Sequence, residues 1–141
     1  YLRMLGFDTL YRNDYDDAEL ARISSQEGRT LLTPDRGLLK RNIVTHGYCL
    51  RATQPRQQLV EVLRRFDLFG SITPFLRCLH CNTLLHSVDK ADISHNLPLK
   101  TVQYYNHFRR CPGCDRIYWQ GSHFKRMQQF VENVIQNQER P

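Results

Sequence analysis

The chain has 141 residues, of which 40% are hydrophobic, and it carries a formal net charge of +6 with a pI of about 9.3. This length and apolar content support one packed domain, or a domain with a small satellite, and argue against a wholly disordered chain. No apolar run approaches the roughly 18 residues of a membrane span and no secretory signal is visible, so we expect no membrane partner. The cationic excess favours a polyanionic partner, although a protein with an ordinary excess of surface charge could have the same net charge.

The first half of the chain predicts an α/β fold. Its start, YLRMLGF (1–7), predicts an amphipathic helix already under way, and from this we expect the chain to be a fragment of a longer protein. Short apolar runs predict strands, and apolar residues at helical spacing predict helices. The predicted strands span 7–11, 29–33 and 47–52, and the predicted helices span 16–28, 35–42 and 55–70. Because strands and helices alternate at short intervals, the sequence predicts a parallel sheet with helices packed on it.

The second half has a different pattern. From Cys78 to Ser122, turns, histidines and aromatic residues replace the helical periodicity. A last helix is predicted at 122–138, where five apolar residues form one stripe that is typical of core packing rather than of a cofactor site. These residues are Phe124, Met127, Phe130, Val131 and Val134. The change of pattern predicts two domains, residues 1–72 and 73–141.

Four of the five cysteines fall into two C-x-x-C pairs, CLHC (78–81) and CPGC (111–114), which are separated by 29 residues. Each tight turn presents two sulfurs to one point, and two such turns complete the tetrahedral set that zinc prefers. The predicted ligands of this structural zinc ion are Cys78, Cys81, Cys111 and Cys114. Because four thiolates leave no open position for water, the ion would hold the fold together rather than catalyse.

Redox-active cysteine pairs are the alternative to a zinc site, and His80 inside the first pair is an alternative ligand. Secreted disulfide-rich proteins seldom combine two C-x-x-C pairs with an unpaired cysteine, which in this chain would be Cys49. The cysteine pattern therefore predicts a reducing compartment, the cytoplasm.

Acidic residues follow two of the predicted strands. Asp35 ends the segment LLTPD, and Asp17 lies at the start of the preceding helix, beside Asp16 and Glu19. In an open parallel sheet, ligands gather beyond the carboxyl ends of the strands. Asp17 and Asp35 are therefore candidate ligands of Mg²⁺ or Mn²⁺, which would activate water against a phosphodiester. Helix capping by these two residues is the competing interpretation, and the local sequence favours it.

Cations surround Asp35, and in the second half they interleave with aromatic residues in QYYNHFRRC (103–111) and RIYWQGSHFKR (116–126). Arginine and lysine neutralise backbone phosphates, and aromatic rings stack on unpaired bases. The candidate nucleic-acid-binding residues are Arg36, Lys40, Arg41, Arg51, Arg109, Arg110, Arg116, Tyr118, Lys125 and Arg126. For any single aromatic residue, Trp119 above all, core packing is the favoured interpretation, and a solvated surface is the alternative for the arginines.

Six motifs follow one another over essentially the whole chain: YLRMLGFDTLY, DDAEL, LLTPDRGLLKR, RCLHCN, CPGC and YWQGSHFKRM. Together they resemble the Mut-seven C-terminal RNase domain family, which has a PIN-like nuclease fold followed by a zinc ribbon. The resemblance implies that Asp17 and Asp35 correspond to acids of a PIN-like site and that the four paired cysteines are zinc ligands. Animal members of this family follow a 3′–5′ exoribonuclease domain, whereas bacterial members can stand alone.

The acidic set of the chain departs from the PIN-like pattern. The first metal-binding aspartate of PIN-like nucleases lies on a strand before the opening helix, and this chain begins after that strand. Relatives often carry another acid two residues beyond the second motif aspartate, where this chain has Gly37. The sequence therefore predicts a PIN-like α/β domain without its first strand, a small zinc ribbon and a C-terminal helix.

The predicted function is binding of RNA, in particular single-stranded RNA, in support of RNA processing or degradation by a nuclease partner or domain. The first alternative is a Mg²⁺- or Mn²⁺-dependent ribonuclease, and the second is a protein-interaction adaptor. The sequence leaves the oligomeric state open.

Overall fold

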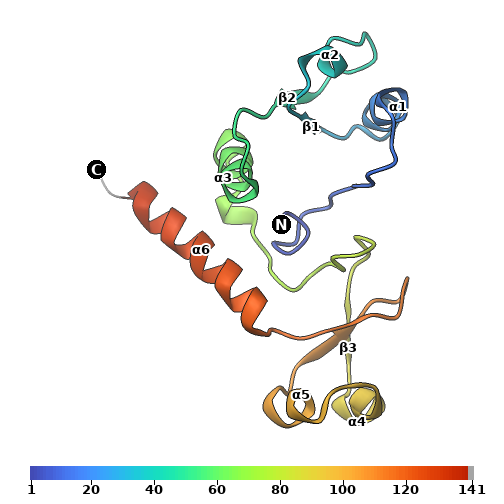
Figure 1. Ribbon diagram of the computed structural model, residues 1–141, viewed down its shortest axis with the longest axis vertical. Helices are drawn as coiled ribbons and strands as arrows, with labels where there is room; N and C mark the ends of the chain where they lie inside the picture. The colour runs from blue at the N-terminus through green and yellow to red at the C-terminus, as the bar shows by residue number, and fades with distance from the viewer. Residues whose placement is uncertain (140–141) are drawn as a thin grey trace. The chain divides into compact units, whose positions relative to one another are not determined.

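The computed structural model describes residues 1–139, with side chains described as far as Gln136 (Figure 1). The chain divides into two compact units. The parallel-sheet unit is Tyr11–Leu68, and the cysteine unit combines Tyr1–Leu10 with the chain from Phe69 onward. The division into domains 1–72 and 73–141 stays a prediction. Within residues 1–139, no helix combines the length and the apolar content that a membrane crossing requires.

The parallel-sheet unit alternates helices and strands, as the sequence predicts. Its elements are α1 (Asp17–Glu27), β1 (Leu31–Thr33), α2 (Arg36–Leu39), β2 (Gly47–Cys49) and α3 (Pro55–Arg65). The strands β1 and β2 pair in parallel, with Leu31 opposite Gly47 and Thr33 opposite Cys49. The mixed α/β class, the small parallel sheet and these three helices are confirmed, although each element is shorter than predicted.

Local signals set the ends of α1, and an apolar cluster holds it in place. The Asp16 carboxylate accepts a hydrogen bond from the Glu19 amide at 2.7 Å, which caps the first turn. Gly28 ends the helix in the left-handed conformation, with φ of 64°, and its amide donates to the Ser24 carbonyl. The helix then packs through Ala21, which is fully buried with residues of β1 and α2. Burial of this apolar face stabilises a helix that is short for an isolated one.

A carboxylate joins the end of β2 to α3. Glu61 accepts hydrogen bonds from the Tyr48 hydroxyl at 2.6 Å and from the amides of Arg51 and Ala52 at 2.9 and 2.8 Å. These hydrogen bonds, with that from Tyr48 the largest, lower the pKa of Glu61 below its usual value. The backbone after β2 is therefore held in one position, from which the exposed Arg51 side chain projects.

Two predictions at the N-terminus are wrong: no helix spans 1–7 and no strand spans 7–11 in the described structure. Residues 2–6 form turns instead, because Met4 and Leu5 are buried by tertiary packing rather than along one helical face. Gly6, with φ of 92°, passes so close to the Thr73 backbone that a side chain would collide with it. The Leu5 carbonyl accepts the Thr73 amide at 2.9 Å, so this contact takes the place of a strand ladder.

The cysteine unit is built on an antiparallel sheet. Its strands are β3 (His86–Val88), β4 (Phe108–Arg110) and β5 (Ile117–Tyr118), paired in the order β3-β4-β5. Two short helices that the sequence analysis did not predict, α4 (Lys90–Ile93) and α5 (Leu99–Tyr104), occupy the spacer between β3 and β4. Single 3-10 turns lie at Phe69–Ser71 and Ser94–Asn96.

The predicted C-terminal helix is confirmed as α6 (Ser122–Glu139). Two residues of its apolar stripe, Met127 and Val131, are only 2% and 5% exposed. The stripe therefore serves core packing, as its spacing indicates.

Candidate metal centre and nucleic-acid interface

The four paired cysteines come together in the cysteine unit. The Sγ atoms of all four lie within 4.8 Å of one another, and Cys78–Cys114 and Cys81–Cys111 are 3.6 and 3.2 Å apart. Four sulfurs bound to one tetrahedral zinc ion at about 2.3 Å are separated by about 3.8 Å, so the cluster has the size that such an ion requires. Among the described side chains, which end at Gln136, this cluster is the one group of three or more histidine, cysteine or acidic residues placed to hold a metal ion.

The two C-x-x-C turns have the same backbone geometry. The residue after each pair donates its amide to the carbonyl of the first cysteine, at 2.9 Å for Asn82 and 2.8 Å for Asp115. The first cysteine in turn donates its amide to the carbonyl two residues beyond the pair, at 2.8 Å in one turn and 2.9 Å in the other. Asn82 and Asp115 both adopt left-handed φ values, 69° and 61°. The repeated turn explains how two separate segments present their sulfurs to one point.

Hydrogen bonds prepare two of the sulfurs for metal binding. The Thr83 hydroxyl, 3.2 Å from the Cys81 sulfur, lowers the pKa of Cys81 to about 6. Burial disfavours ionisation of Cys78, but the Tyr118 hydroxyl at 3.0 Å and nearby backbone amides together lower its pKa. Burial raises the pKa of Cys111 to about 11. Because a metal ion binds the thiolate form, the low pKa of Cys81 favours binding, whereas binding at Cys111 requires displacement of a proton that burial retains.

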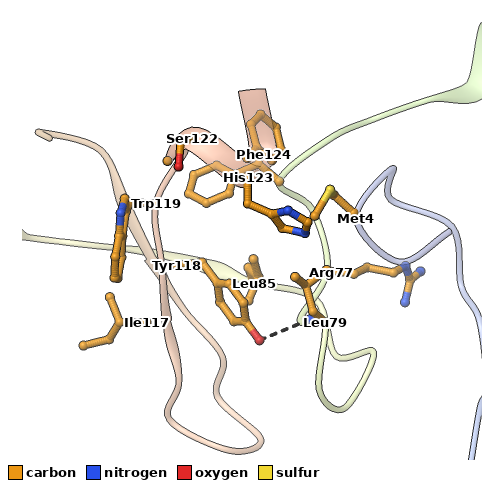
Figure 2. Close-up of a pocket in the computed structure, with 12 residues that line it drawn as sticks. Met4, Arg77, Leu79, Leu85, Ile117, Tyr118, Trp119, Ser122, His123 and Phe124 are labelled. Carbon is orange, nitrogen blue, oxygen red and sulfur yellow. Dashed lines mark hydrogen bonds between the residues drawn. The ribbon is translucent and has the colours of Figure 1, made fainter. Parts of the chain in front are cut away.

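A pocket of about 330 Å³ lies beside the cluster, within the cysteine unit (Figure 2). Tyr118 belongs to both sites: its ring lines the pocket, and its hydroxyl approaches Cys78 and accepts the Leu79 amide at 3.1 Å. Burial, followed by the contact with Cys78, raises the pKa of Tyr118 above its usual value. The lining residues are Met4, Phe75, Arg77, Leu79, Leu85, Ile117, Tyr118, Trp119, Gly121, Ser122, His123 and Phe124.

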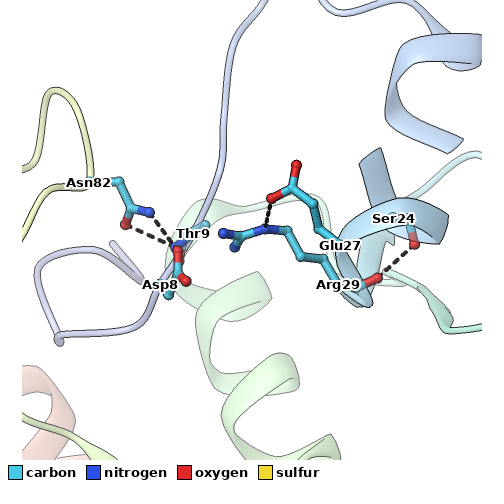
Figure 3. A network of polar contacts seen from close by, with 6 residues as sticks. All are labelled: Asp8, Thr9, Ser24, Glu27, Arg29 and Asn82. Carbon is cyan, nitrogen blue, oxygen red and sulfur yellow. Dashed lines mark hydrogen bonds and ion pairs between the residues drawn. The ribbon is translucent and has the colours of Figure 1, made fainter. Parts of the chain in front are cut away.

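Residues near the N-terminus hold the first C-x-x-C turn through Asn82, which is 7% exposed (Figure 3). The Asn82 side chain donates to the Asp8 carboxylate at 2.6 Å and accepts the Thr9 amide at 3.0 Å. Arg3 adds hydrogen bonds to two carbonyls inside the turn, at 3.1 and 3.0 Å. This support was not predicted, because the partners of Asn82 lie more than seventy positions away in the sequence.

The two candidate catalytic acids occupy the starts of helices. The Asp35 carboxylate accepts the Gly37 amide at 2.8 Å and so caps α2, directly after β1. Asp16 caps α1, and Asp17 is the first residue inside that helix. Asp17 and Asp35 are both exposed, and in the described chain neither joins a group of three or more potential metal ligands. Capping by Asp35 is therefore observed, and the catalytic role of both acids stays a prediction.

The model of the Mut7-C RNAse domain family matches residues 1–131 of the 141-residue chain. The chain belongs to this family. The match covers the whole parallel-sheet unit, the cysteine cluster and the first ten residues of α6, and it confirms the resemblance seen in the motifs. Comparisons with curated proteins and with solved structures gave no significant match. Membership of the Mut7-C RNAse domain family associates the chain with an RNA-related nuclease function.

Most candidate RNA-binding residues of this Mut7-C domain have exposed side chains. The exposed ones are Arg36, Lys40, Arg41, Arg51, Arg116, Lys125 and Arg126. Three others are partly buried, and two of them make structural contacts. Arg109 donates to the Phe75 carbonyl at 2.7 Å, and the Tyr118 hydroxyl lies at the cysteine cluster. The third, Arg110, is half-buried on β4. RNA binding by these ten residues stays a prediction.

Proposed function

We propose that this Mut7-C domain binds single-stranded RNA and supports RNA processing or degradation in the cytoplasm, beside a nuclease partner or domain. The observation that carries the proposal is family membership joined to a cationic and aromatic C-terminal half. Residues 71–141 contain 9 basic and 5 acidic side chains, whereas residues 1–70 contain 11 and 9. A surface with few acids attracts phosphates, and its aromatic rings offer stacking platforms for bases.

A structural zinc ion and a PIN-like arrangement belong to the same proposal. The sulfur separations and the two equivalent turns support zinc held by Cys78, Cys81, Cys111 and Cys114. The closed set of four thiolates supports a role in folding rather than in catalysis. The parallel pairing of β1 with β2, each followed by a helix, supports a PIN-like scaffold.

RNA binding is tested by fluorescence anisotropy with a labelled single-stranded RNA at a series of salt concentrations. We expect binding that weakens as salt rises, with a slope of the logarithmic plot of about −0.7 per phosphate contacted. Arg126→Ala, on exposed α6, is expected to weaken binding and to reduce that slope by about one contact. Lys100→Ala removes the same charge from exposed α5 and is the matched control, which we expect to bind as the unaltered protein does. Absence of salt-sensitive binding at low salt would contradict the proposal.

A metal-dependent ribonuclease is the second candidate function, because Asp35 stands at the carboxyl end of β1 in a family described as an RNAse domain. Here Asp17 and Asp35 would hold a Mg²⁺ or Mn²⁺ ion, which when bound activates water and stabilises charge on the phosphate. A carboxylate has several acceptor sites, so the hydrogen bond from Gly37 leaves Asp35 capacity for a cation.

The nuclease alternative is tested by comparing Asp35→Asn with Asp35→Ala. Asparagine caps helices as well as aspartate does, so Asp35→Asn is expected to keep the unfolding free energy while abolishing metal-dependent cleavage. Asp35→Ala is expected to lose cleavage and also about 1 kcal/mol of stability. The measurements are cleavage of labelled RNA with Mg²⁺ or Mn²⁺ and urea denaturation. Equal cleavage by Asp35→Asn and the unaltered protein would show that any activity arises elsewhere.

A further inference from the structure

We propose that the pocket beside the cysteine cluster receives one unpaired nucleobase of bound RNA, which stacks on Trp119. The inference rests on the proposed RNA-binding function and deepens it by naming the site and the part of the RNA that the site recognises.

The size and walls of the pocket suit a flat aromatic ligand. Its volume, about 330 Å³, lies at the lower end of the range for small-molecule sites. Four aromatic residues line it, Phe75, Tyr118, Trp119 and Phe124, and all four are half-buried. A half-buried ring is packed in place and still offers surface to a ligand. A planar base stacks on apolar surface, and the four rings provide such surface in this pocket.

Two polar side chains, Ser122 and His123, also line the pocket and offer hydrogen-bonding groups to the edge of a base. Figure 2 shows Trp119 on one side, Met4 and Arg77 on the other, and His123 between them. Trp119 is supported by the buried Phe108, whose ring centroid lies 6.2 Å away. The stacking surface is thus fixed before a ligand arrives, which limits the ordering entropy lost on binding.

The charge of the pocket is complementary to a phosphate next to the base. None of its lining residues is acidic in the described chain. The first turn of α6, Ser122–Phe124, forms part of the lining, and Gly121 before it has no side chain to cap the first amides. The positive end of this 18-residue helix favours an anion, and Lys125 and Arg126 follow at once. The phosphate of a base in the pocket therefore lies near the positive end of α6 and near Lys125 and Arg126.

The backbone of Phe75 provides an independent sign of a functional wall. Its φ of 64° is uncommon for an aromatic residue and persists only where the surroundings enforce it. Arg109 enforces it, since its guanidinium donates to the Phe75 carbonyl at 2.7 Å and lies 4.9 Å from the ring centroid. The Phe75 ring then meets Phe124 edge to face at 6.1 Å. Arg109 is therefore a positioning residue for this wall.

The first test uses the intrinsic fluorescence of Trp119, which is the sole tryptophan of the chain. Titration with single-stranded oligoadenylate of about a dozen nucleotides is expected to quench this fluorescence, with the same midpoint as the anisotropy of labelled RNA. An abasic ribose-phosphate oligomer of equal length is expected to bind through its phosphates without quenching. RNA binding that leaves the Trp119 fluorescence unchanged would overturn the pocket proposal and leave the proposed function standing.

The second test separates stacking from phosphate attraction. Trp119→Ala is expected to weaken binding of oligoadenylate about ten-fold without changing the salt slope, and Trp119→Phe is expected to restore much of the loss. Ser122→Glu, which suits the start of a helix and so keeps the fold, is expected to weaken binding more than Gln128→Glu. Gln128 is exposed on the same helix outside the pocket. If Trp119→Ala and Ser122→Glu both bind with the affinity of the unaltered protein, the pocket proposal is overturned. If neither the unaltered protein nor any variant binds RNA, the proposed function is overturned as well.

Discussion

Chelation of zinc is expected to unfold the cysteine unit, with loss of its cooperative thermal transition and of its near-ultraviolet circular dichroism. The buried cluster around the sulfurs of this unit consists of Cys78, Leu85 and Cys111, with Phe75 and Tyr118 packed against them in part. Its strands are only two or three residues long, and sheets of this size do not persist without further support. A structural zinc ion supplies about 10–16 kcal/mol, which equals or exceeds the whole stability of a typical domain.

A pair of cysteine variants gives the control for chelation. Cys111→Ser is expected to reduce the metal content below one zinc per chain and to abolish the same transition, because Cys111 is fully buried in the cluster. Cys49→Ser alters a half-buried thiol outside the cluster and is expected to keep both. Metal content is measured by atomic emission, and folding by circular dichroism. A zinc-free chain that still melts cooperatively would refute the structural role of the metal.

The parts of the site that the sequence predicted are those that local sequence determines. Each C-x-x-C turn is closed by hydrogen bonds between residues no more than five positions apart, so spacing alone was enough to predict that the four sulfurs come together. The parallel pairing of β1 and β2 followed similarly from the alternation of short apolar runs with helical periodicity. The short helices α4 and α5 were missed because four and six residues are too few to show a period of 3.6.

The failures near the N-terminus have a tertiary cause. In sequence, the segment YLRMLGF (1–7) resembles an amphipathic helix, but its Met4 and Leu5 are buried in a turn segment. Gly6 allows this segment to approach the Thr73 backbone closely. The segment after it resembles a strand, but Thr9 pairs with the side chain of Asn82 rather than with another strand. Partners separated by more than seventy positions leave no local pattern.

The pocket could not be predicted from local sequence either. Cations and aromatic residues interleave from Arg116 to Arg126 in the sequence, and core packing was the favoured interpretation of Trp119. In the structure, Trp119 packs against Phe108 and also lines a pocket with Met4 and Leu79, which lie in separate stretches of the chain. A pocket whose lining residues are far apart in the sequence can be identified only from the folded structure.

Asn82→Ala is expected to destabilise the zinc-loaded cysteine unit by about 2–5 kcal/mol. Part of this effect is backbone strain, since alanine at φ of 69° costs about 1–2 kcal/mol. The rest, about 1–3 kcal/mol, follows because the buried side chain no longer pairs with Asp8 and Thr9. Asn82→Gly tolerates the positive φ and is expected to show the second contribution alone. The measurement is urea denaturation with excess zinc.

The equivalent turn of the second pair provides the matched control. Asp115 occupies the same position with φ of 61°, but its side chain is exposed. Asp115→Ala is therefore expected to cost only the strain, about 1–2 kcal/mol, and Asp115→Gly is expected to cost close to nothing. The difference between Asn82→Ala and Asp115→Ala then measures what the N-terminal residues contribute to the metal centre. If the two alanine variants lose equal stability, residues 1–10 give the first turn no energetic support, and the hydrogen bonds of Asn82 only accompany a geometry that the metal imposes.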